Sequence, residues 1–65
     1  MICAVEIWQN NNIIDMYTNE SAWNCVKWFN REYLQAYHGG ECAIKVYLND
    51  IELTNEEIIN FGFLD

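Results

Sequence analysis

One segment, residues 18–40, constrains what this chain can fold into more than any other: TNESAWNCVKWFNREYLQAYHGG. It opens on residues that favour a helix start and closes on Gly39 and Gly40, which favour a helix stop. Between these ends, apolar residues recur three and four apart around Phe29 and Tyr33. The segment therefore predicts an amphipathic helix. It is the only segment long enough to cover a small core.

The expected helix has a recognisable start and one aromatic residue that its pattern does not explain. Thr18 or Asn19 is the expected cap, and Glu20 follows in the first turn, where the helix dipole favours an acid. Trp28 falls among polar residues, opposite the apolar stripe. Exposed aromatic residues are enriched in binding hot spots, so Trp28 is a candidate partner-binding residue. The alternative is that residues 61–64 fold back and cover it.

The residues before the helix alternate with the period of a β-strand. Residues 2–8 and 13–17 predict two half-buried strands, and residues 9–12, rich in asparagine, predict the turn of a hairpin. The side chains expected to face the core are Cys3, Val5, Ile7, Ile14 and Met16.

In a regular hairpin with this loop, two acids lie opposite each other. Trp8 then faces Ile13, and Glu6 faces Asp15. Like charges in that position destabilise a sheet. Either a base such as Lys45 lies between them or the pair serves a purpose, so Glu6 and Asp15 are candidate partner-binding residues.

The residues after the helix predict a second hairpin and a short terminal element. Residues 42–53 alternate around Asn49 and Asp50, a two-residue connection that hairpins favour. Thr54 and Glu57 then have the spacing of a capping box, which predicts a short helix ending near residue 62. A fifth strand over residues 58–64 is the alternative.

These elements predict one α+β domain over residues 1–65, in the order β-β-α-β-β. One helix packs on one face of a small, mainly antiparallel sheet. Over residues 2–57 this order resembles the β-grasp order of ubiquitin-like folds. No ubiquitin-like recognition residue matches, and the chain closes on GFLD in place of a conjugation diglycine. The resemblance therefore implies nothing about conjugation.

The reactive residue types do not indicate catalysis. The three cysteines, Cys3, Cys25 and Cys42, lack CxxC spacing, and each falls at an inward position, as reduced core cysteines do. His38 is the one histidine and lies at the expected end of the helix. No phosphate-binding loop or metal-spaced cluster is present. We expect no enzyme, no cofactor and no metal; a small redox or metal protein is the alternative and would need reactive thiols.

Charge limits the partners of the chain. Ten acids against three bases give a net charge of −7, and residues 41–65 hold six of the acids and one base. Such a chain is repelled by nucleic acid and anionic membranes and is steered toward basic surfaces. The first residues lack the basic region of a signal peptide, and no apolar run approaches the ~20 residues of a membrane span. The expected location is the cytoplasm.

One sheet face should remain uncovered, because only one helix is available. It is expected to display Trp8, Ile13, Tyr17 and Tyr47 among Glu6, Asp15 and Glu52, a mixture that suits protein binding. The candidate partner-binding residues are Glu6, Asp15, Trp28, Tyr47, Asp50, Glu52, Glu56 and Glu57.

In size, acidity and lack of catalytic residues, the chain is similar to phage-encoded inhibitors of host defence, the anti-CRISPR proteins among them. That resemblance implies a stoichiometric inhibitor acting in the host cytoplasm. It would occupy, as a nucleic-acid mimic, the nucleic-acid-binding surface of a basic nuclease complex such as a CRISPR effector. The alternative is a structural or assembly module that homodimerises through its open sheet face or an edge strand.

Overall fold

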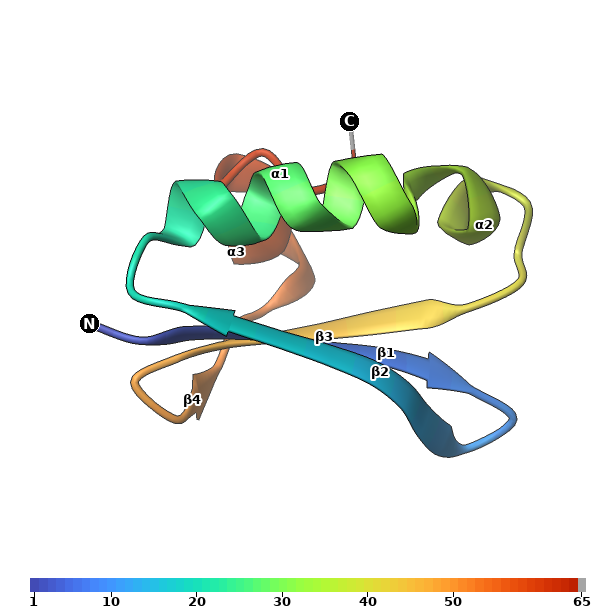
Figure 1. The fold of residues 1–65 in the computed structure, drawn as a ribbon, viewed down its shortest axis with the longest axis horizontal. Coiled ribbons are helices and arrows are strands. Elements are labelled where there is room, and N and C mark those ends of the chain that lie inside the picture. Colours follow the sequence, from blue (N-terminus) through green and yellow to red (C-terminus); the bar gives the residue numbers. More distant parts are fainter. Residues whose placement is uncertain (65) are drawn as a thin grey trace.

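The computed structural model describes residues 1–64, which form a four-stranded sheet with helices on one face (Figure 1). The predicted α+β class, the β-β-α-β-β order and the short helix near the C-terminus are confirmed. The elements are β1 (Cys3–Gln9), β2 (Asn12–Asn19), α1 (Ala22–Glu32), α2 (Leu34–His38), β3 (Ala43–Leu48), β4 (Ile51–Glu52) and α3 (Asn55–Asn60).

The strand order is β2-β1-β3-β4, and every neighbouring pair is antiparallel. Because β1 lies between β2 and β3, those two strands run parallel, and α1 and α2 cross over the sheet to connect them. The central strand is therefore the most buried. Cys3, Val5 and Ile7 on its inner side are each at most 1% exposed.

The first hairpin differs from the prediction in its turn and its register. The turn holds two residues, Asn10 and Asn11, both with positive φ (54° and 64°), as type I′ hairpin turns require. Trp8 pairs with Ile13 as predicted. The register then shifts, so Ile7 pairs with Asp15, and Ile14 has no partner on β1. That residue forms a β-bulge.

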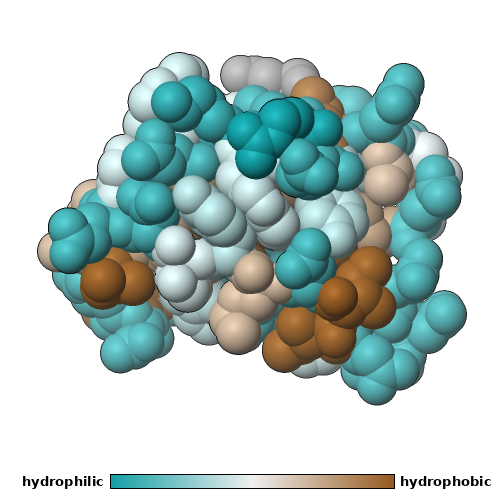
Figure 2. Space-filling view, in the orientation of Figure 1, coloured by the Kyte–Doolittle hydropathy of each residue, from teal (hydrophilic) through white to brown (hydrophobic). Residues whose placement is uncertain are grey.

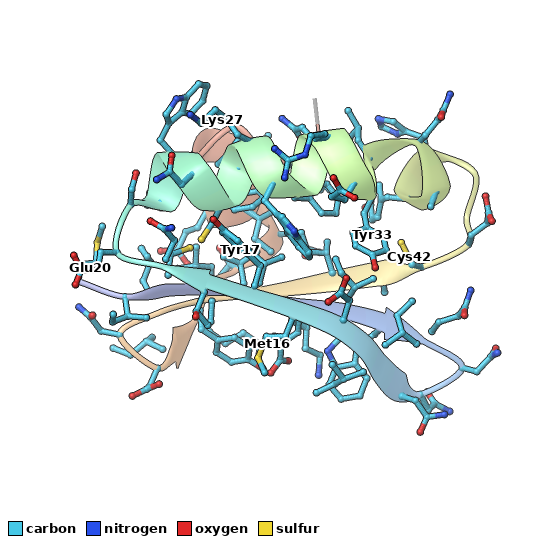
Figure 3. The ribbon with its side chains drawn as sticks, viewed as in Figure 1. Met16, Tyr17, Glu20, Lys27, Tyr33 and Cys42 are labelled. Carbon is cyan, nitrogen blue, oxygen red and sulfur yellow. The ribbon has the colours of Figure 1, made fainter. Side chains whose placement is uncertain are left out.

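The bulge reverses which side of the sheet the rest of β2 faces. Asp15 and Tyr17 pair with the inward Ile7 and Val5, while Met16 pairs with the outward Glu6. Figure 3 shows Tyr17 directed toward the helices and Met16 directed away from them. The predictions that Glu6 faces Asp15 and that Ile14 and Met16 point inward are therefore wrong. Ile14 is 48% exposed and Met16 is 55% exposed.

The helix begins later than predicted. Thr18 and Asn19 continue the strand, opposite Ala4 and Cys3. Ser21 is the cap instead, and its Oγ accepts the amide of the third residue of α1 at 3.3 Å. The helical backbone is interrupted at Tyr33 (φ −131°), where α1 gives way to α2.

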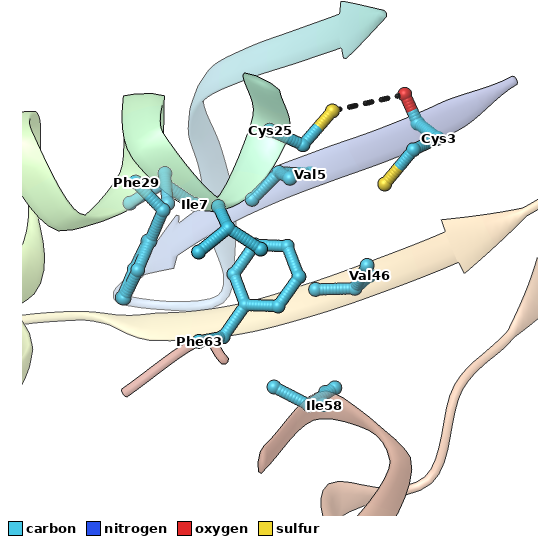
Figure 4. Close-up of a cluster of buried hydrophobic side chains, with 9 residues drawn as sticks. Cys3, Val5, Ile7, Cys25, Phe29, Val46, Ile58 and Phe63 are labelled. Atoms are coloured by element: carbon cyan, nitrogen blue, oxygen red, sulfur yellow. Dashed lines mark hydrogen bonds between the residues drawn. The ribbon is translucent and has the colours of Figure 1, made fainter. Parts of the chain in front are cut away.

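The C-terminal segment closes the core from the helical side. The predicted capping box between Thr54 and Glu57 is formed, and α3 follows it. Gly62 has φ +104°, a conformation that glycine tolerates, and turns the chain so that Phe63 enters the core. Residues 58–64 are therefore a helix end and a turn, and the strand alternative is wrong. Figure 4 shows this core, whose buried residues are Cys3, Val5, Ile7, Cys25, Val26, Phe29, Val46, Ile58 and Phe63.

Candidate functional site: two interaction surfaces

The uncovered face of the sheet carries acids on both sides of a tyrosine. Tyr47 of β3 lies between Ala4 of β1 and Glu52 of β4. Burial and the negative charges of Glu6 and Glu52 raise the pKa of the Tyr47 hydroxyl above its usual range. In the strand register, Glu52 is directly opposite Tyr47, and Glu6 is opposite Lys45, two residues from Tyr47 on the same face. We call Glu6, Trp8, Lys45, Tyr47 and Glu52 the open acidic face.

Trp8 orders one end of this face. Its Nε1 donates a hydrogen bond to Oε1 of Glu6 at 3.1 Å, and the Nζ of Lys45 lies 4.5 Å from its ring centroid. Lys45 is thus held over an indole by a cation–π contact. Within residues 1–64, the single salt bridge joins Arg31 to the adjacent Glu32 at 2.7 Å. The carboxylates of the open acidic face remain available to the cations of a partner.

The other predicted acids are divided between two parts of the molecule. Asp50 occupies the tight turn between β3 and β4, with φ +67°, at the end of the open acidic face. Glu56 and Glu57 belong to α3, which lies in the helical layer (Figure 1). Oε1 of Glu57 also accepts the amide of Thr54 at 2.9 Å. The structure therefore brings Glu6, Tyr47, Asp50 and Glu52 together but not Glu56 and Glu57.

Trp28 is half-buried and covered, contrary to the predicted exposed position. The ring of Tyr17 stacks on it with centroids 5.0 Å apart and planes 9° apart, and the ring of Tyr33 lies 5.4 Å away. The bulge in β2 places Tyr17 on this side of the sheet. The cover is thus a strand residue and not residues 61–64. We call Tyr17, Trp28 and Tyr33 the aromatic cluster.

Asp15 is fixed beside this cluster and is absent from the open face, where it was predicted. Its Oδ2 accepts the hydroxyl of Tyr33 at 2.6 Å, and its Oδ1 accepts the amide of Met16 at 2.8 Å. The hydrogen bond to the Asp15 carboxylate is the main cause that raises the pKa of Tyr33 to about 12. Asp15 therefore links the edge strand to the junction of α1 and α2.

A group of exposed apolar side chains lies along β2, next to the open acidic face, because Ile13 pairs with Trp8 and Met16 pairs with Glu6. β2 is an eight-residue edge strand, whereas β4 at the other edge has two residues. Ile13, Ile14 and Met16 are 46%, 48% and 55% exposed along it. Figure 2 shows a brown, apolar area at the lower right, over the start of β2. We call Ile13, Ile14 and Met16 the β2 edge patch. Ile13 was predicted to be outward, whereas the exposure of Ile14 and Met16 depends on the bulge, which no local feature of the sequence indicates.

The sequence analysis also missed Trp23, the aromatic residue of α1 that is exposed. Its side chain is 62% accessible, while Trp28 five residues later is covered. At 100° per residue, Trp23 lies at the flank of the apolar face of the helix. Exposure of this indole makes Trp23 a better candidate for a surface contact than Trp28.

The thiols lie in environments that suppress their reactivity. Cys3 and Cys25 are buried, and the Sγ of Cys25 donates to the carbonyl oxygen of Cys3 at 3.5 Å (Figure 4). Burial is the main cause that raises the pKa of Cys3 to about 12 and also raises that of Cys25. Burial and the charge of Glu41 raise the pKa of the half-buried Cys42. Within residues 1–64, no group of three or more metal-ligating side chains is arranged around a common point.

We expect the folded chain to resist alkylation. A raised pKa lowers the thiolate fraction, and the thiolate is the reacting species. In iodoacetamide at pH 8, the native chain should take up at most one adduct, at Cys42, in the time in which the urea-unfolded chain takes up three. Intact-mass spectrometry and peptide mapping measure this. Rapid labelling of Cys3 or Cys25 in the native chain would favour the redox alternative instead.

None of the helices in residues 1–64 has the length and apolar character needed to cross a membrane. In the comparisons with known proteins, no protein-family model, no curated protein and no solved structure matches the chain.

Proposed function

We propose that this chain is a small acidic protein-binding inhibitor that occupies the nucleic-acid-binding surface of a basic host nuclease complex. The observation that carries the proposal is the open acidic face, where Glu6 and Glu52 flank Tyr47 without a bridging cation in residues 1–64. This is the mode of action that its resemblance to the anti-CRISPR proteins implies. Under this proposal the chain acts in the cytoplasm of the host cell.

The chemistry of this face suits a partner rich in arginine and lysine. Carboxylates take the place of the phosphates that such a partner normally binds, and Tyr47 and Trp8 add flat apolar area beside them. Asp50 extends the negative surface at the hairpin end. Glu56 and Glu57 lie elsewhere and contribute through the net charge of −7, which speeds encounter with a basic partner.

The test uses two double variants that change the net charge equally. Purified CRISPR effector complexes and other nucleases are first screened for loss of DNA cleavage at rising molar ratios of the chain. For a nuclease that is inhibited, Glu6→Gln with Glu52→Gln is expected to weaken binding roughly 10- to 100-fold, because charged contacts are lost at the interface. Glu20→Gln with Glu41→Gln, two exposed acids outside the open acidic face, should change it less than about threefold.

Salt provides the second measurement. Binding should weaken steeply between 50 and 500 mM salt, because exposed charge pairs are screened. The proposal is wrong if no nuclease in the screen is inhibited or if inhibition is insensitive to salt. It is also wrong if the two double variants weaken binding equally, since net charge alone would then account for the effect.

A further inference from the structure

We propose that the Tyr47 end of the open acidic face binds an arginine side chain of the partner. The guanidinium group stacks on the Tyr47 ring and donates hydrogen bonds to the Glu52 carboxylate. This inference rests on the proposed function, because it names the group of the basic partner that this face receives. It adds a preference for arginine over lysine, which net charge alone does not produce.

The first reason is that the other end of the face already holds a cation on an aromatic ring. Lys45 is directly opposite Glu6 in the strand register, yet the two form no salt bridge. Instead, the Nζ of Lys45 lies 4.5 Å from the centroid of the Trp8 ring, and Nε1 of that ring donates to Oε1 of Glu6 at 3.1 Å. An aromatic ring beside a carboxylate therefore binds a cation within the chain itself, and the Trp8 ring is occupied.

The second reason is that Tyr47 and Glu52 form a similar pair without a cation. They are directly opposite each other on β3 and β4, which places their Cβ atoms ~5 Å apart. On the other side, Tyr47 is opposite Ala4, whose methyl group is too small to cover the ring. In residues 1–64, the one cation–π contact is at Trp8 and the one salt bridge joins Arg31 to its neighbour. No cation of this part of the chain occupies the Tyr47 end.

Charge directs an incoming cation to this end. Burial raises the pKa of the Tyr47 hydroxyl, and the negative charges of Glu6 and Glu52 raise it further. Asp50 adds a third acid in the adjoining turn. Lys45, the one base of the open acidic face, is held at the Trp8 end. The potential around the Tyr47 ring is therefore negative and favours a cation.

The chemistry of the pair favours arginine over lysine. A guanidinium group is planar, stacks on aromatic rings and donates two parallel hydrogen bonds to one carboxylate. It can therefore contact Tyr47 and Glu52 at the same time. The ammonium group of lysine is compact and more strongly hydrated, so it loses more hydration on binding and cannot make the bidentate contact.

The test compares two peptides of equal charge, octa-arginine and octa-lysine, with no nuclease present. Fluorescence anisotropy of the labelled peptides at 150 mM salt measures their affinities. The wild type should bind octa-arginine about five times more tightly than octa-lysine. Tyr47→Leu keeps the net charge and should reduce this ratio to less than about twofold. Phe61→Leu removes a ring outside the face, 40% exposed, and should keep the ratio. Circular dichroism establishes that the variants are folded.

A second pair of variants does not depend on how well the fold tolerates Tyr47→Leu. Glu52→Gln and Glu20→Gln each remove one negative charge from an exposed residue. Glu52→Gln should weaken octa-arginine binding roughly three- to fivefold, because the bidentate contact is lost. Glu20→Gln lies outside the open acidic face and should weaken it less than about twofold.

Three results overturn the inference. They are equal affinity of the wild type for the two peptides, a ratio that survives Tyr47→Leu, and equal weakening by Glu52→Gln and Glu20→Gln. The nuclease screen is decided separately. An arginine preference that depends on Tyr47, with no nuclease inhibited, would overturn the proposed function alone. Inhibition of a nuclease without this preference would overturn the inference alone.

Discussion

Replacing Phe63 with alanine is expected to lower the free energy of unfolding by about 3–4 kcal/mol, the usual loss for a buried phenylalanine. Phe63 is 1% exposed, and its ring centroid lies 6.0 Å from that of Phe29. The whole stability of a domain of this size is about 3–10 kcal/mol. Phe63→Ala should therefore leave a large part of the population unfolded at room temperature.

Phe61 provides the matched control on the same turn. It is 40% exposed, so Phe61→Ala should cost less than about 1 kcal/mol. Urea unfolding followed by circular dichroism gives both values, with the wild type as the reference. Similar losses from the two variants would mean that Phe63 does not close the core. A Phe63→Ala loss below 1 kcal/mol would lead to the same conclusion.

The parts of the fold that local chemistry determines could be predicted from the sequence. Thr54 and Glu57 form their capping box because both partners lie within one turn of each other. The alternation in β1 and β3 is regular, so the outward positions of Glu6 and Tyr47 followed from it. The position of Glu52 opposite Tyr47 was also predictable, because Asn49 and Asp50 form the tight turn that the sequence indicated. This half of the candidate site was therefore predictable.

The bulge in β2 is what the sequence could not indicate. A shift of one residue moves every later side chain to the other face of a sheet. Ile13 and Ile14 are both apolar, so the sequence does not indicate which of them is the unpaired residue of the bulge. As a result Asp15, Tyr17 and Met16 were each assigned to the wrong face. The exposure of Met16 in the β2 edge patch and the position of Tyr17 in the aromatic cluster both arise from this one irregularity.

The helix start was misjudged for a similar reason. Thr18 and Asn19 are good caps when considered locally. In the fold they extend the ladder opposite Ala4 and Cys3, and Ser21 takes the capping position. Pairing with strand residues 14 and 16 positions earlier in the chain outweighed a local preference. Local patterns contain no information about that competition.

The second large expected effect is a difference in the free energy of unfolding between substitutions of the two tryptophans of α1. Around the helix axis, Trp23 and Trp28 lie on opposite flanks, each roughly 110° from the centre of the buried stripe, at 100° per residue. Periodicity alone therefore cannot say which of them is covered. The stack with Tyr17 at 5.0 Å covers Trp28, while Trp23 is 62% exposed. Trp28→Ala should cost about 2–3 kcal/mol, somewhat less than a fully buried aromatic residue. Trp23→Ala should cost less than about 1 kcal/mol.

Thermal and urea unfolding of both variants measures this difference, and Trp28→Phe refines it. Phenylalanine keeps a ring against Tyr17, so Trp28→Phe should recover more than half of the loss. If Trp28 is structural, Trp28→Phe should also inhibit a susceptible nuclease as well as the wild type does. The opposite pattern would be wild-type stability in Trp28→Ala together with lost inhibition. That result would make Trp28 an exposed anchor after all, and the stack with Tyr17 would then have to open when the partner binds.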